Sequence, residues 1–454
     1  MKNFCAILSI IILSFGIVSA QETDQKSVNV TIYNQNFGVV KDVRKLNITK
    51  GVSEIQIRGV AKLIDPTSVH IKFDGAVIEQ NYRYDLANMN VILDRYIDKE
   101  IMLVGKESSF SGELMSYAGN QLVIKQKDGG IVMLPNYNEY RLLAPSLPEG
   151  LISKPTLNWL VNSTKDGNHD VEISYQTQGL NWHTEYVALL NKDDSKLDMS
   201  AWISIENNSG AQYKNANLKL VAGDVNRVDD LNLRKAGGLR AEMAYMDKVG
   251  SEPQFEEKEF FEYHIYDLQR PTTISDKETK QVSLFETTGV PINKLFIYNS
   301  NGNNIENGKP EVFVEFINSA KSALGMPMPK GKVRLYKSDE KDLEFIGEDL
   351  IDHTPKDEKV KLKVGEAFDI RIDEKIVSTK QISRNVSDSE FEVKIKNRKK
   401  DKSVVYIDRM LYSNWEILEK NHDYEKLNAY KVRFKIDLPA DTEKTLKYKV
   451  RFNY

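Results

Sequence analysis

Apolar and polar residues alternate one by one along most of this chain, and this period-2 pattern constrains the fold more than any other feature. Early in the chain Val28, Val30 and Ile32 alternate with polar neighbours, and late in the chain residues 430–438 are apolar at every second position. Successive side chains of a strand point to opposite faces, so such segments bury one face and expose the other to water. Long amphipathic helical patterns are scarce. The sequence therefore predicts an all-β protein built from antiparallel sheets.

Turn residues divide the predicted strands of the first third of the chain. Residues 21–97 are expected to form an N-terminal β-domain. Residues 98–145 hold four short strands separated by Gly119-Asn120 and Asp128-Gly129-Gly130. This spacing is typical of small SH3-like or Sm-like barrels.

The remaining two thirds are expected to form immunoglobulin-like β-sandwich modules. This region covers residues 146–454, with 366–454 as a candidate separate sandwich. Residues 226–258 interrupt the alternation with Gly237-Gly238 and scattered charges. We predict a mobile loop there, which limited proteolysis would cut first.

Three predicted strands share a local design, because each runs into an asparagine and then into a polar turn. An asparagine side chain at a strand end can satisfy the turning backbone, and the residue tolerates left-handed geometry. Two interpretations stay open: repeated sandwich modules, or coincidence, since asparagine is common at turns. The segments are Trp202–Glu206 before Asn207, Val312–Ile317 before Asn318, and Phe391–Lys396 before Asn397.

The first twenty residues have the parts of a secretory signal. Lys2 supplies a positive charge, an apolar stretch follows, and Val18-Ser19-Ala20 fits a cleavage site between Ala20 and Gln21. An uncleaved N-terminal anchor is the alternative, but the apolar stretch is short for a membrane span. We expect export to the periplasm or cell surface of a bacterium, with no transmembrane anchor after cleavage.

Cysteine use and charge exclude several classes of function. The single cysteine, Cys5, lies inside the predicted signal, so the mature chain would have no thiol for disulfides, thiolate catalysis or zinc. The formal net charge is −3, and no basic stripe stands out. The sequence therefore predicts no nucleic-acid partner.

Several motifs stand in order within residues 147–454. They are Pro148-Glu149-Gly150-Leu151-Ile152, the run Ser174 to Trp182, the run Asn217 to Asp224, the run Gly325 to Gly331, and Asp352-His353-Thr354-Pro355. In these motifs the chain resembles the domain of unknown function that forms the C-terminal part of mucoidy-inhibitor-A-like exported bacterial proteins. The resemblance implies export and the fold, and it implies no activity because none is established for the family. The family carries long helical, coiled-coil-like sequence where this chain has the predicted small barrel.

The densest polar cluster surrounds Thr354-Pro355. Carboxylates and a histidine within ten residues could bind a hard divalent cation. The alternative is a hairpin loop in which Asp352 accepts backbone N–H groups. We favour the loop, because Ca²⁺ loops space their ligands at alternate positions and include a glycine. The candidate metal ligands are Asp349, Asp352, His353 and Asp357, with Glu348 and Glu358 beside them.

Aromatic and histidine residues elsewhere offer weaker signals. Trp182-His183 with Tyr175 and Tyr186 could form a catalytic or sugar-stacking site, but a tryptophan on a sandwich strand more often fills the core. His169 and His264 have no acid or nucleophile at a recognisable spacing. The stretch from Phe255 to Tyr266 is expected to be a strand, with an aromatic ligand-binding edge as the alternative.

Motifs for nucleophilic, zinc and phosphate chemistry are missing from the sequence, so no catalytic residue and no cofactor is predicted. The leading hypothesis is an exported, non-catalytic cell-envelope protein that binds a protein or a polysaccharide through its sandwich modules. One alternative is a metal-assisted hydrolase that uses the loop of Asp352 and His353. Another is an outer-membrane-associated barrel component, suggested by Tyr454 at the end of a long alternating strand.

Overall fold

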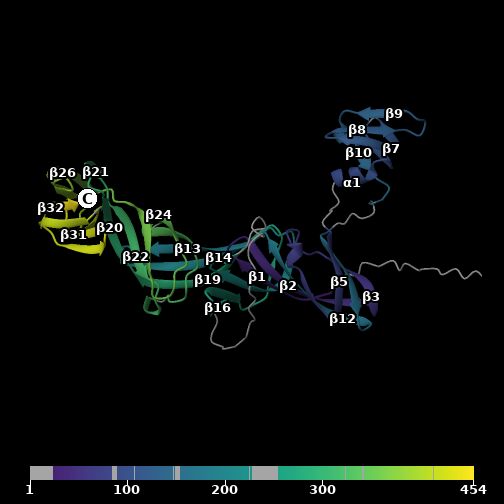
Figure 1. Cartoon of the computed structure of the whole chain (residues 1–454), viewed down its shortest axis with the longest axis horizontal. Helices are drawn as coiled ribbons and strands as arrows, with labels where there is room; N and C mark the ends of the chain where they lie inside the picture. Colours follow the sequence, from purple (N-terminus) through teal and green to yellow (C-terminus); the bar gives the residue numbers. More distant parts are fainter. Residues whose placement is uncertain are drawn as a thin grey trace, which may run out of the picture.

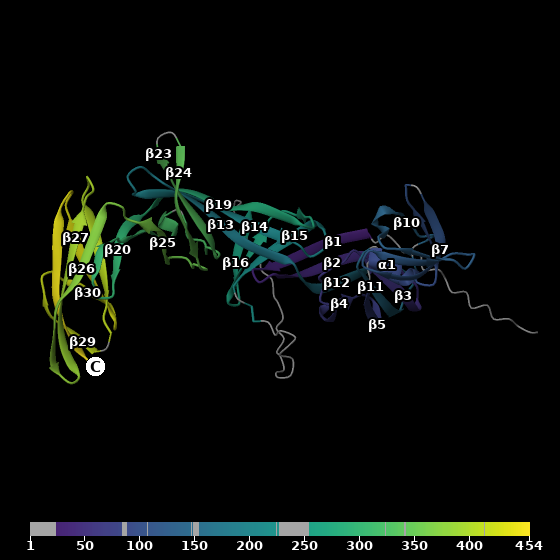
Figure 2. The same cartoon turned by 90° about the horizontal axis from the view of Figure 1, so that it is seen from above.

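The computed structural model describes residues 24–83, 89–106, 108–146, 148, 154–223, 225–226, 254–322, 324–339, 342–412 and 414–454. The predicted signal, its cleavage site at Ala20 and Gln21, and most of the predicted loop lie outside the described residues. Almost all regular structure within them is β-strand, arranged in six sheets, which confirms the all-β prediction. No described helix is long and apolar enough to cross a bilayer. Figures 1 and 2 show the sandwiches following one another in an elongated row.

The first sandwich contains an eight-stranded sheet with the order β16-β17-β15-β1-β2-β12-β4, and β18 pairs with β15. All of its pairs are antiparallel except β1 with β15. The strands are β1 (Asp24–Tyr33), β2 (Phe37–Ile48), β4 (His70–Lys72), β12 (Gly167–Gln178), β15 (Tyr213–Ala222), β16 (Phe255–Phe260), β17 (Tyr263–Leu268) and β18 (Thr272–Ile274). The predicted strand from Phe255 to Tyr266 is thus a hairpin.

A three-stranded sheet with the order β3-β11-β5 adjoins it. Its strands are β3 (Gly51–Arg58), β5 (Gly75–Arg83) and β11 (Thr156–Ser163), with the short helix η1 (Pro66–Ser68) between β3 and β5. Both β11 and β12 belong to the predicted region 146–454, yet β11 pairs with β3 and β5, and β12 pairs with β2. Residues 21–97 therefore do not form their own set of sheets. Alternation predicts that a segment is a strand but not which strand it pairs with. The sequence therefore did not predict that β11 and β12 pair with strands of residues 21–97.

The small module lies between β5 and β11 in the chain, and Figure 1 shows it standing apart from the row. Its core joins Leu93 and Tyr96 of the helix to Leu103, Leu114 and Ile124 of the sheet. The sheet order is β10-β6-β7-β8-β9. The elements are α1 (Met89–Tyr96), β6 (Glu100–Val104), β7 (Ser109–Ala118), β8 (Gln121–Lys125), β9 (Ile131–Leu134), η2 (Tyr137–Glu139) and β10 (Arg141–Leu143).

The prediction of a closed barrel for this module is wrong for the described residues, because its two outer strands do not pair with each other. They have only four and three residues, and the turn of η2 separates them. The spacing of turns predicted the strands correctly, but closure depends on strand length and tilt, which spacing does not report.

The second sandwich is built on a five-stranded sheet with the order β19-β14-β13-β23-β24. Its strands are β13 (Leu180–Leu190), β14 (Lys196–Asn207), β19 (Glu278–Pro291), β23 (Gly331–Asp339) and β24 (Asp342–Ile351). Residues along β13 and β14 belong to one continuous apolar cluster, which also contains Ile32 of the first sandwich and Phe316 of the second. These strands are therefore shared by two successive sandwiches.

A six-stranded sheet belongs to both the second and the third sandwich: its strands β22 and β25 contribute Phe316 and Leu362 to the apolar cluster of β13 and β14, and its other strands pack against a five-stranded sheet in the third sandwich. The six-stranded sheet has the order β25-β22-β20-β28-β31-β30 and the five-stranded sheet has the order β21-β26-β27-β32-β29. Val405, Phe434, Val393 and Val450 are among the residues of the third sandwich's separate core. The elements are β20 (Asn293–Ser300), β21 (Ile305–Gly308), β22 (Glu311–Ile317), η4 (Ala320–Ser322), β25 (Lys359–Glu366), β26 (Ile370–Ser383), β27 (Val386–Asn397), β28 (Ser403–Met410), β29 (Asn414–Lys420), β30 (Tyr424–Asn428), β31 (Lys431–Leu438) and β32 (Glu443–Asn453).

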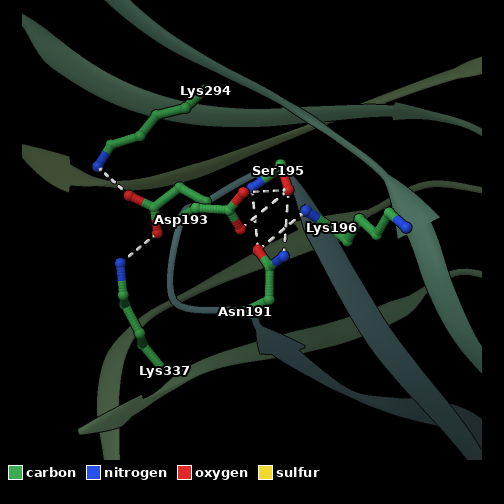
Figure 3. A network of polar contacts seen from close by, with 7 residues as sticks. Asn191, Asp193, Ser195, Lys196, Lys294 and Lys337 are labelled. Carbon is green, nitrogen blue, oxygen red and sulfur yellow. Dashed lines mark hydrogen bonds and ion pairs between the residues drawn. The ribbon is translucent and has the colours of Figure 1, made fainter.

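The turn between β13 and β14 ties neighbouring strands together (Figure 3). Asn191 Oδ1 accepts hydrogen bonds from the backbone N–H groups of Ser195 and Lys196, at 2.9 and 3.0 Å, which fixes the turn. Asp194 binds Lys294 of β20 at 2.8 Å and Lys337 of β23. Burial alone would raise the pKa of Asp194, but the two lysines outweigh it and hold the pKa below its usual value.

The three asparagines singled out in the sequence play one role, which we name the Asn clasp. Each is fully buried, and each side-chain amide donates to two consecutive backbone carbonyls of a neighbouring turn. The carbonyl pairs are 274 and 275 for Asn207, 354 and 355 for Asn318, and 438 and 439 for Asn397. In each turn the residue two positions later has positive φ: Lys277, Asp357 and Asp441. The repeated geometry favours repeated modules over coincidence, although the left-handed residue is not the asparagine.

Candidate functional site

The predicted metal loop does not assemble a metal site, because its carboxylates bind backbone amides. Asp349 accepts from Leu350 N and Lys363 N at 2.9 and 2.7 Å, and Asp352 Oδ1 accepts from His353 N at 2.8 Å. Asp357 adopts positive φ in the turn held by Asn318. No group of three or more metal-ligating side chains comes together anywhere in the described part of the chain. The hairpin interpretation explains these residues.

His353 has a structural position between two sandwiches. Its Nδ1 accepts a hydrogen bond from Lys330 N at 3.2 Å, and its Nε2 lies 3.1 Å from Asn34 Nδ2 in the turn between β1 and β2. Met328 and Thr354 form an isolated antiparallel bridge beside it. Two of the family-like motifs thus meet each other and the N-terminal hairpin, where they serve packing and orientation.

The Trp182 cluster forms part of the core, as we favoured from the sequence. Trp182 is 1% exposed and donates from Nε1 to Val221 O at 3.2 Å, while Tyr186 donates to Pro329 O at 2.6 Å. His169 is buried as well. His264 lies 2.7 Å from Glu257 across the hairpin of β16 and β17, a partner that a search for local motifs did not find.

The outward face of the second sandwich carries a different arrangement. On β14 the residues Ala201, Ile203 and Ile205 point into the core, so Trp202 must point outward, and it is 42% exposed. Trp202 lies directly opposite Glu185 of β13. We name this surface the Trp202 face and define it by His183, Glu185, Trp202, Glu206, Arg334 and Glu348.

Contacts among charged side chains organise the Trp202 face. Glu185 lies at the centre, with Oε1 at 3.3 Å from His183 Nε2 and Oε2 at 2.5 Å from Arg334 Nη1. The other ring nitrogen of His183, Nδ1, lies 3.8 Å from Glu206 Oε1. On the far side of Arg334, Nε lies 3.7 Å from Glu348 Oε2. The side chains are between one fifth and one half exposed, so the network is held in place and remains accessible to water.

This arrangement is suited to binding rather than to nucleophilic catalysis. Ser204 is paired with His183 across the sheet. Both ring nitrogens of His183 are directed at carboxylates, so neither is placed to take a proton from Ser204. The Ser204 hydroxyl instead accepts a hydrogen bond from Gln281 at 3.0 Å and is buried. What the face offers is an exposed indole ring beside oriented donors and acceptors.

The sequence patterns led us to consider Trp182 as a candidate site residue, whereas Trp202 was treated only as part of a strand. The signal was present, since Ser200, Trp202, Ser204 and Glu206 are the polar phase of the same alternation that buries Ala201, Ile203 and Ile205. A tryptophan in the polar phase of a regular strand has no core to fill. That observation alone could have identified it.

The outward surface of the small module has a shallow depression of about 240 Å³. Its lining is mostly apolar and includes Met102, Leu143 and Pro145, with Glu100 at its side. Nothing in the structure shows what would cover it.

The chain matches no known family model, and no curated protein matches it.

Proposed function

We propose that this chain is an exported, non-catalytic protein of the bacterial cell envelope that binds an envelope protein or polysaccharide through the Trp202 face. The single observation that carries the proposal is the outward Trp202, exposed beside a network of His183, Glu185 and Arg334. The first twenty residues support export, as does the resemblance to the mucoidy-inhibitor-A-like proteins, to which we propose a relationship.

The proposal of binding without catalysis has two supports. The loop of Asp352 and His353, the basis of the hydrolase alternative, uses its polar atoms to hold backbone. The face around Trp202 has hydrogen-bonding groups but no activated nucleophile among the residues described.

Export is tested by the N-terminus of the protein recovered from fractionated cells of its own host. We expect a mature chain that begins at Gln21, in the periplasmic or surface fraction. An Ala20→Arg variant should block cleavage and retain the protein with its first twenty residues. Recovery of the uncleaved wild-type chain from the cytosol would refute export.

Binding is tested with immobilised protein and detergent-free envelope extract, in which bound sugar and bound protein are both quantified. The wild type should retain material that the double variant Trp202→Ala, Arg334→Ala does not. Tyr412→Ala, which removes another exposed aromatic ring outside the face, is the matched control and should behave as the wild type. Equal retention by all three would show that the Trp202 face binds no partner.

A further inference from the structure

We propose that the ligand of the Trp202 face is an uncharged polysaccharide, whose pyranose rings stack on the indole of Trp202. This inference rests on the proposed function and names the chemical class of the ligand.

The surroundings of Trp202 leave its ring accessible from one side. Its neighbours two residues away on β14 are Ser200 and Ser204, and the residue opposite on β19 is Ser283. These serine side chains are short, Ser204 is itself only 2% exposed, and Trp202 keeps 42% of its surface exposed. The apolar C–H face of a sugar ring can pack on the exposed part of the indole while its hydroxyls stay hydrated.

The groups next to the ring match the edge of a sugar. A hydroxyl is both donor and acceptor, and it can join a carboxylate to a guanidinium without an unpaired atom. Glu185, opposite Trp202, is a carboxylate already oriented by Arg334 and His183. Because their partners already hold these side chains, little side-chain entropy is lost when a ligand binds.

Charge favours a neutral chain over an acidic one. The carboxylates of Glu185, Glu206 and Glu348 are interleaved with the cations of Arg334 and Lys332 and with His183. Three carboxylates against two fixed cations leave no net positive charge, and the residual field is screened over a Debye length of about 8 Å at physiological salt. The face therefore has no positive field that would attract a polyanion.

The same composition argues against a protein partner. The centre of a protein interface is usually poor in charged side chains and rich in contiguous apolar surface. Here five of the six residues that define the face are ionisable, and Trp202 is the aromatic residue among them. Sugar hydroxyls can form hydrogen bonds with these ionisable side chains while some of the side chains remain hydrated.

The test uses the full mature chain and four immobilised polysaccharides: dextran, mannan and laminarin as uncharged probes, and alginate as an acidic probe. Binding is measured by affinity electrophoresis and by tryptophan fluorescence with acrylamide as quencher. Of the four tryptophans, Trp159 and Trp182 are 1% exposed, Trp415 is partly exposed and Trp202 is 42% exposed, so quenching is measured in a Trp415→Phe background, where protection reports mainly on Trp202.

We expect binding to at least one uncharged probe, protection of Trp202 from acrylamide, and little change in affinity at high NaCl. Trp202→Ala should weaken binding by about tenfold or more, as for an aromatic anchor at the centre of a binding site. Trp202→Phe should recover part of that loss because it keeps an aromatic face, and Tyr412→Ala should change nothing. Circular dichroism checks that each variant remains folded.

Three outcomes would overturn the inference. If only alginate binds, and NaCl abolishes that binding, the ligand is acidic. If no polysaccharide binds but the envelope extract yields a protein whose retention requires Trp202, the polysaccharide inference fails and the proposed function stands. If neither sugar nor protein retention depends on Trp202, both fail.

Discussion

The second and third sandwiches both expose one face of a sheet, and they use that face in opposite ways. On β26, β27 and β32 of the third sandwich the outward residues form what we call the ion-pair ladder: Lys375, Asp388, Glu390, Glu392, Lys447, Lys449 and Arg451. Glu392 joins Lys375 at 2.8 Å to Lys447 at 3.1 Å, and Asp388 binds Arg451 at 2.8 Å. On the Trp202 face, Glu185 similarly joins Arg334 to His183, but a tryptophan lies opposite it.

The two sheet faces have similar ion-pair networks and differ in the exposed aromatic ring of the Trp202 face. In the ladder the paired outward positions are ionic, and none of its seven residues is aromatic. The Trp202 face keeps a comparable network and adds an indole that is 42% exposed. Surface ion pairs contribute only about 0–1 kcal/mol each to stability, so neither network is required for the fold.

The largest effect that we predict is the loss of stability when an Asn clasp, which both sandwiches contain, is removed. Asn318→Ala and Asn397→Ala should each lower the free energy of unfolding by about 3 kcal/mol, because each change removes the hydrogen bonds that a fully buried amide donates to three backbone carbonyls. Urea unfolding followed by circular dichroism measures the loss. Asn453→Ala, at an exposed asparagine, is the control and should be near neutral. A loss at only one clasp would break the structural equivalence of the two sandwiches.

A smaller effect should distinguish the two faces. Glu185→Ala and Glu392→Ala each remove a carboxylate that joins two basic side chains, and each should cost less than about 1 kcal/mol of stability. Only Glu185→Ala should weaken binding of the polysaccharide, by about tenfold, because it removes an acceptor and releases Arg334. Equal affinity of the two variants, measured by affinity electrophoresis, would contradict the assignment of the ligand to the Trp202 face.

The smallest effect is the response of the ladder to acid. Hydrogen bonds from Arg451, Lys449 and Lys375 lower the pKa values of Asp388, Glu390 and Glu392, respectively. Because folding lowers these values, the stability they contribute is present above the ordinary carboxyl pKa of about 4 and is lost as pH falls through the lower folded value. Thermal unfolding should show a fall in Tm in that range. The variant Glu390→Gln, Glu392→Gln should show a shallower fall, and an unchanged slope would refute this account.

Local pattern predicted the class of fold well, because alternation reports directly which face of a strand is buried. It also identified Asn207, Asn318 and Asn397, since a polar residue that ends an apolar strand is a local signal. Strand partners were not predictable in the same way. The pairing of β11 with β3 and β5 joins residues about one hundred positions apart, across the whole small module. No periodicity within a segment encodes that contact.

The candidate site was harder to predict for a related reason. Asp352 and His353 are close in sequence, and this proximity suggested a ligand set, but their atoms turned out to bind neighbouring backbone. Arg334 lies far from Glu185 in the sequence, and the parallel pairing of β13 with β23 brings the two together. Trp202 could be recognised from its phase in the strand, whereas its charged neighbours required the sheet order.

The strands shared between successive sandwiches have a mechanical consequence. Because β13 and β14 belong to one apolar cluster that joins the first and second sandwiches, a pulling force between the ends of the row passes along continuous strands rather than through a linker. Under such a load many inter-strand hydrogen bonds must break together rather than one after another. The molecule should therefore resist extension and hold the Trp202 face at a fixed distance from either end of the row.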